Sequence, residues 1–97
     1  MENLKRYSSF IKRIITAPEH IRKKLLKTSN LSIIQAICEL LLNVIQKNIT
    51  VSKSVLRNLK KHKTILYKLL ETKGFEARKY ILISYPKIVV PLLPLFK

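Results

Sequence analysis

The sequence predicts an all-α protein, a small bundle of about four helices with an extended, proline-rich apolar tail at its C-terminus. Three observations carry this prediction. Apolar and basic residues sort onto opposite faces at spacings of three and four, a helical period that strand alternation does not reproduce. The 97 residues are 47% hydrophobic, enough for the modest core of one domain. Three of the four prolines fall after residue 84, where they forbid a regular helix.

The first two helices are expected near residues 3–15 and 18–27. In the first, Leu4, Tyr7 and Ile11 share a face that basic residues avoid. Pro18 ends this helix and suits the first turn of the next. The second helix has a thin apolar face, so it is expected to lean on another element.

Residues 31–47 form the most apolar predicted helix, with Asn30 or Ser32 as N-cap and Asn48 as the C-terminal stop. No lysine or arginine occurs between Leu31 and Gln46. Its apolar surface covers more than half of the circumference, which is more than one short neighbour covers. Either several helices surround it or it meets a second copy of the chain. We predict a homo-oligomer that self-associates through Ile34, Ile37, Leu41 and Ile45.

The stretch "KSVLRNLKKHKTILYKLL" predicts an amphipathic helix over about 53–72. Ser52 is placed to cap it, and Gly74, the only glycine, suits the left-handed position that closes it. A short helix near 75–83 completes a single helical domain over residues 1–84.

Residues 85–97, "YPKIVVPLLPLFK", are almost uncharged and are broken by prolines. A membrane span needs about 20 apolar residues, so this run is too short and a membrane partner is not expected. We predict an extended peptide that lies in a groove of its own domain, of a second copy or of a capsid protein. Its docking side chains would be Ile88, Val90, Leu92, Leu93, Leu95 and Phe96.

Twenty lysines and arginines against five acids give a net charge of +15, which attracts polyanions. A charge run is usually a solvated helix face, and abundant lysine is also a mark of AT-rich genomes. Solvated faces normally interleave glutamate with lysine, however, and no acid occurs between Thr50 and Leu70. Tryptophan is absent, which disfavours base stacking and leaves phosphate contact without reading of sequence. The predicted nucleic-acid-binding residues are Arg22, Lys23, Lys24, Lys53, Arg57, Lys60, Lys61 and Lys68.

Other chemistry finds little support in the sequence. His20, His62 and the single cysteine, Cys38, have no metal-ligand spacing, so neither a metal nor another cofactor is predicted. Cys38 lies in the middle of an apolar helical face, where a buried, protonated thiol is the ordinary interpretation, and we predict no enzyme activity. The N-terminus lacks the apolar core of a secretory signal, so export by a signal peptide is not expected.

Five short motifs occur in order along the chain: Cys38-Glu39, Leu42-Asn43-Val44, Asn48-Ile49-Thr50-Val51-Ser52, Lys61-His62-Lys63 and Pro91-Leu92-Leu93-Pro94. In these motifs and their order the chain resembles the short basic proteins of Polinton-like and adintovirus-type DNA elements, which are likened to the adenovirus core protein X precursor. The resemblance covers about residues 21–95. It implies a virion core or minor capsid protein that binds and condenses packaged DNA, inside the particle and in the host nucleus or cytoplasm.

One departure from the family pattern concerns proteolytic processing. The Gly-Gly pair that belongs to the protease site in adenovirus precursors is replaced by Ser84-Tyr85, and the lysine run before it is reduced to Arg78 and Lys79.

Sequence-independent nucleic-acid binding is the expected function. The alternatives are an interaction protein that docks under a capsid shell through its tail, and a membrane-active amphipathic protein.

Overall fold

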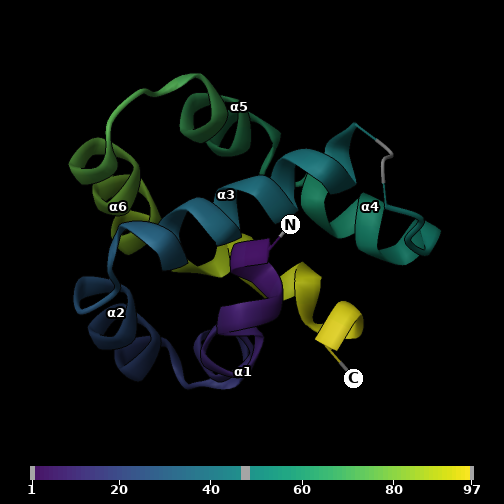
Figure 1. The fold of residues 1–97 in the computed structure, drawn as a ribbon. Coiled ribbons are helices and arrows are strands. Elements are labelled where there is room, and N and C mark those ends of the chain that lie inside the picture. The colour runs from purple at the N-terminus through teal and green to yellow at the C-terminus, as the bar shows by residue number, and fades with distance from the viewer. Residues whose placement is uncertain (1, 47–48, 97) are drawn as a thin grey trace.

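The computed structural model describes residues 2–46 and 49–96, and in them the chain forms helices joined by short turns, with no strand. Six α-helices precede a 3₁₀-helix, η1, at Pro86–Phe96 (Figure 1). The all-α class is therefore confirmed, whereas the expected number of about four helices is too low. The α-helices are α1 Glu2–Thr16, α2 Glu19–Lys27, α3 Leu31–Ile45, α4 Lys53–Lys60, α5 Lys63–Glu71 and α6 Phe75–Ser84.

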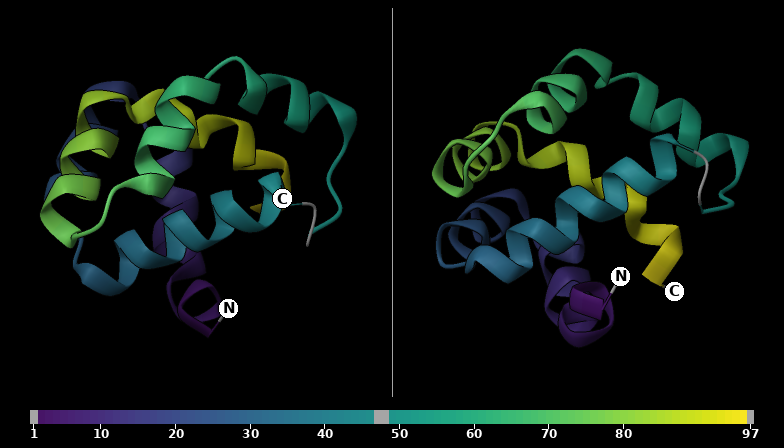
Figure 2. Two further views of the ribbon diagram at one scale, coloured as in Figure 1. Left: turned by 90° about the horizontal axis from the view of Figure 1, so that it is seen from above. Right: turned by 45° about the horizontal axis from the view of Figure 1, so that its top comes forward.

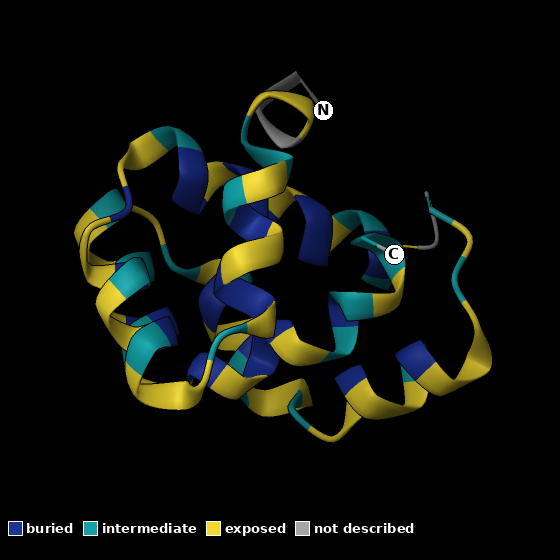
Figure 3. Cartoon of the chain, turned by 90° about the horizontal axis from the view of Figure 1, so that it is seen from below, coloured by how far each residue is buried: buried dark blue, intermediate teal, exposed yellow. Residues whose placement is uncertain are grey.

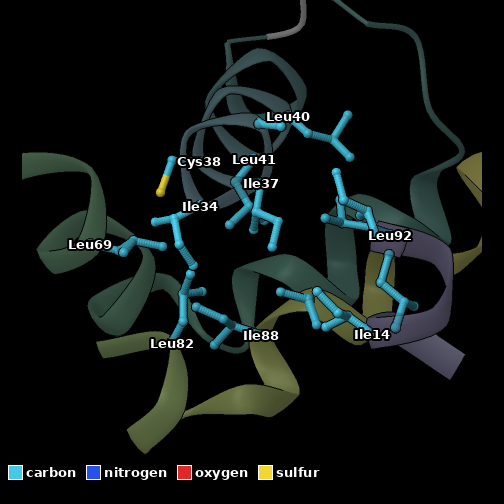
Figure 4. Close-up of a cluster of buried hydrophobic side chains, with 14 of the residues drawn as sticks. Ile14, Ile34, Ile37, Cys38, Leu40, Leu41, Leu69, Leu82, Ile88 and Leu92 are labelled. Atoms are coloured by element: carbon cyan, nitrogen blue, oxygen red, sulfur yellow. The ribbon is translucent and has the colours of Figure 1, made fainter. Parts of the chain in front are cut away.

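Helix α3 lies at the centre of the fold, in contact with α1, α5, α6 and η1 (Figures 1 and 2). Its surroundings explain its sequence, because a helix covered on most sides needs apolar residues around most of its circumference. Side chains from these elements converge on α3 in one continuous core (Figure 4). Exposed residues lie on the outside of the surrounding helices (Figure 3).

Two of the predicted helix starts are confirmed by hydrogen bonds. The Asn30 side chain accepts a bond of 3.0 Å from the Ile33 amide, so Asn30 rather than Ser32 caps α3. The Ser52 hydroxyl accepts a bond of 3.3 Å from the Val55 amide at the start of α4. The predicted stop at Asn48 lies outside the described residues.

Gly74 has the positive φ, +101°, that only glycine adopts without strain. Its position differs from the expected one, however. Thr72 is the C-cap of α5, and Gly74 is the N-cap residue of α6, so the glycine starts a helix instead of closing one.

The single helix predicted over 53–72 is wrong, because the chain turns at Lys61 and His62 between α4 and α5. At the turn the His62 amide donates to the Leu59 carbonyl, three residues back, at 2.9 Å. Two physical effects favour the break. Lys60 and Lys63, three positions apart, would repel each other on one face of a continuous helix. The turn also lets α4 pack on η1 while α5 packs on α3 and α6.

The extended conformation predicted for the tail is also wrong. Residues 86–96 form η1, which contacts α1, α2, α3, α4 and α6. This segment takes a helical path despite Pro91 and Pro94, because the φ of about −65° that proline fixes lies within the range of a 3₁₀-helix. Pro86, Ile88, Val89 and Leu92 are buried. The boundary predicted at residue 84 therefore divides one shared core.

No single helix in residues 2–46 and 49–96 is both long and apolar enough to cross a membrane. Helices α6 and η1 together satisfy that test by length and composition, but they are bent by 89°.

Candidate nucleic-acid interface

The basic face of α4 and α5 is the principal candidate site. Lys53, Arg57 and Lys60 recur at helical spacing on α4, opposite the buried Val55 and Leu59. The other two predicted cations of this region, Lys61 at the turn and Lys68 on α5, are exposed as well. Glu71, at the end of α5, is the first acid after this face. We call Lys53, Arg57, Lys60, Lys61 and Lys68 the α4–α5 basic face.

Helix α2 contributes only part of what the sequence predicted. Lys23 and Lys24 are exposed, as a phosphate-binding role requires. Arg22 is not available to a ligand, because it is 8% exposed and turns back onto the end of α1.

The Arg22 guanidinium caps the C-terminus of α1. Its Nε donates to the Ile14 carbonyl at 2.9 Å, and one terminal nitrogen donates to the carbonyls of Ile15 at 3.0 Å and Ala17 at 2.7 Å. These carbonyls lie at the end of a helix, where no further backbone amide is available to donate to them. A cation at this end also interacts favourably with the negative pole of the helix dipole. Burial lowers the pKa of Arg22 and the Glu19 carboxylate acts against this shift. A structural role replaces the predicted ligand-binding one.

We expect Arg22→Ala to lower the free energy of unfolding by about 2–4 kcal/mol, because three charged hydrogen bonds to helix-end carbonyls are lost. Urea denaturation followed by circular dichroism measures this change. The neighbouring Lys23→Ala is the control, expected within about 0.5 kcal/mol of wild type because the side chain is exposed. Wild-type stability in Arg22→Ala, together with weakened nucleic-acid binding, would return Arg22 to the interface.

Two further cations serve the fold, and the sequence alone gave no sign of it. Arg78 Nε donates to the Thr72 carbonyl at 2.7 Å, where α5 ends. Lys79 Nζ donates to the Ser29 carbonyl at 3.0 Å, tying α6 to the turn between α2 and α3. The net charge therefore has two parts, cations that satisfy backbone carbonyls and cations that face outward.

The residues predicted for self-association lie in the interior of a single chain. Ile34, Ile37 and Leu41 are at most 1% exposed, and Ile45 is half-buried. Figure 4 shows the first three in the same cluster as Ile88 and Leu92 of η1. The surrounding helices and η1 cover the apolar face of α3, which the sequence predicted to be covered either by several helices or by a second copy of the chain.

The predicted docking tail packs against its own domain, which is the first of the three grooves that the sequence allowed; the others were on a second copy and on a capsid protein. Ile88 and Leu92 are 1% exposed. Val90 is 37% exposed, and the remaining three side chains, Leu93, Leu95 and Phe96, are partly buried against the core.

Cys38 is buried on α3, and burial raises the pKa of its thiol to about 11. Arg78 lowers the thiol pKa and Glu39 raises it, but both effects are smaller than that of burial. At neutral pH the thiol is protonated and is a poor nucleophile. Within the part of the chain that the structure describes, no three histidine, cysteine or acidic side chains gather as a metal site.

Lys63 is a cation of this region that is not among the predicted nucleic-acid-binding residues. It is exposed at the start of α5, and its Nζ lies 5.7 Å from the centre of the Tyr67 ring. Its spacing of three from Lys60 was the available signal. The prediction of a single helix over 53–72 did not group Lys63 with the other cations, because it did not include the turn that changes the direction of α5.

Comparison with known proteins gives no assignment, because no protein-family model, curated protein or solved structure matches this chain.

Proposed function

We propose that the protein binds nucleic acid through phosphate contacts, without reading base sequence. The observation that carries the proposal is the α4–α5 basic face, where every predicted cation is exposed and no acid lies between Thr50 and Leu70. Lys23 and Lys24 on α2 extend the binding set. Arg22 is omitted because of its contacts with α1.

The like charges on this face favour the binding of an anionic ligand. Like charges at helical spacing destabilise the helix that bears them by a few tenths of a kcal/mol per pair. A polyanion removes this repulsion and releases its own counterions, which favours binding. With a charge of +15, the whole chain adds a long-range attraction for the same ligand.

The composition of the face supports sequence-independent binding. Its side chains are lysines and one arginine, which suit phosphate oxygens, and Tyr67 is the exposed aromatic residue beside them. One aromatic ring makes a poor stacking platform for successive bases. Duplex DNA is the ligand that we propose.

The resemblance to core protein X precursors supports a virion core role, in which the chain condenses packaged DNA within a particle. The alternative of docking to a capsid through the tail loses support, because Ile88, Val89 and Leu92 of the tail are buried in the chain's own core. This docking would require η1 to leave the domain.

A charge-matched pair of triple variants tests the proposal. The first combines Arg57→Gln, Lys61→Gln and Lys68→Gln on the α4–α5 basic face. The second combines Lys12→Gln, Arg13→Gln and Lys27→Gln at exposed sites on α1 and α2. Both lower the net charge from +15 by 3, to +12.

The measurement is fluorescence anisotropy with a labelled random duplex. We expect the first variant to bind about 10- to 100-fold more weakly and the second to stay within about 3-fold of wild type. Equal losses in the two variants would mean that overall charge, and not this face, determines binding.

A further inference from the structure

An apolar groove of about 370 Å³ lies where α4 turns into α5. Leu59 and Leu66 line it and are 2% exposed, and Leu56 and Ile45 line it while remaining half-exposed. The α4–α5 turn creates this groove. On one straight helix, Leu59 and Leu66 would lie one above the other on the same face, with no angle between two helices to form a hollow. Phosphate groups are anionic and gain nothing from contact with apolar side chains, so the proposed nucleic-acid binding does not account for this groove.

Lysines and a tyrosine edge the groove. Lys60 and Lys63 contribute to its lining and are exposed, so their ammonium groups reach solvent beside the leucines. Tyr67, 44% exposed, adds an aromatic wall near the Lys63 ammonium. The groove thus presents apolar contact area within reach of two positive charges.

We propose that this groove binds an acidic amphipathic helix of a partner protein. Leucines at i, i+3, i+4 and i+7 of such a helix would span about 10 Å and would contact the exposed parts of Ile45, Leu56 and Tyr67. Glutamates beside them would pair with Lys60 and Lys63. Among the described residues that line the groove there is no acid to pair with these lysines, and none occurs in the sequence between Thr50 and Leu70.

Charge and shape favour this occupant over two others. A second copy of the chain carries +15 and would bring like charge to Lys60 and Lys63. The backbone of nucleic acid pairs with lysines but has no apolar face to cover the exposed parts of Ile45, Leu56 and Tyr67. Half-exposed walls also suit a helix that keeps one side in water.

The probe is a fluorescein-labelled peptide of about 18 residues, ~27 Å as a helix, with leucine along one face, glutamate beside it and alanine elsewhere. The control peptide has the same composition, scrambled so that the leucines share no face. Anisotropy at physiological ionic strength is measured without nucleic acid, so the result is independent of the proposed DNA binding. We expect micromolar binding of the amphipathic peptide and at least tenfold weaker binding of the scrambled one.

Two variants of the groove and one control locate the site. Lys63→Glu reverses a charge at the groove, and its place at the start of α5 tolerates an acid because of the helix dipole. Tyr67→Ser removes the aromatic wall. Lys12→Glu makes the same charge change as Lys63→Glu on α1, which lies across α3 from α5 (Figures 1 and 2). We expect about tenfold weaker peptide binding in each groove variant and at most twofold in Lys12→Glu.

Three results would overturn the proposal. Equal binding of the scrambled peptide would show attraction by charge alone. An equal loss in Lys12→Glu would place the effect outside the groove. Sedimentation that shows a wild-type dimer and a Tyr67→Ser monomer would assign the groove to a second copy.

Discussion

Deletion of residues 86–97 is expected to unfold the protein. This segment buries Ile88, Val89 and Leu92 against α1, α2, α3, α4 and α6. Each fully buried aliphatic side chain contributes about 1.5–3 kcal/mol, so the three together contribute ~5–9 kcal/mol. A domain of this size is stable by only about 5–15 kcal/mol. Far-ultraviolet circular dichroism of the truncated chain should show loss of most helical signal and of any cooperative thermal transition.

A pair of point variants within η1 separates lost packing from shortening of the chain. Leu92→Lys places a charge at a position that is 1% exposed and should destabilise the fold nearly as severely as the deletion. Val90→Lys makes the same kind of change at a position that is 37% exposed and should keep the wild-type transition within a few degrees. A truncated chain with wild-type helicity and melting would show that η1 is dispensable and restore the detachable tail that the sequence predicted.

Leu41→Lys on α3 is the second variant with a large expected effect. Leu41 is fully buried in the core of one chain. Leucine and lysine have similar helix propensities, so the effect arises from burying an unpaired ammonium group and losing apolar contacts. We expect a loss of at least ~4 kcal/mol, which leaves the chain largely unfolded, as measured by urea denaturation.

Leu42→Lys provides the neighbouring control, because Leu42 is 37% exposed on the same helix. Its free energy of unfolding should lie within about 1 kcal/mol of wild type. A folded Leu41→Lys chain that sediments as a smaller particle than wild type would contradict the burial within one chain. It would support the oligomer interface that the sequence predicted.

The features that sequence predicted correctly depend on local interactions. The helical period around Val55 and Leu59 reflects which face is buried, and both residues are buried. The caps at Asn30 and Ser52 each join residues three positions apart, so short-range chemistry determines them.

The features that sequence did not predict depend on contacts between distant segments. Helix α3 needs several covering elements, and the sequence does not say that η1, more than 40 residues later, is one of them. The Arg22 side chain looks like any other basic residue until α2 turns back toward the end of α1. The same holds for Lys79, whose carbonyl partner on Ser29 is 50 residues away.

The salt dependence of duplex binding tests the central claim most directly. Each phosphate contact contributes a slope near −0.9 in log K against log salt concentration, so the five cations of the α4–α5 basic face are expected to contribute about −4 to −5 to the wild-type slope, equal for duplexes of different sequence. The variant that combines Arg57→Gln, Lys61→Gln and Lys68→Gln removes three of these contacts and should reduce that contribution to about −2, while the α1–α2 control keeps the wild-type slope. A slope near zero, or one that is the same in all three proteins, would contradict phosphate binding by the α4–α5 basic face.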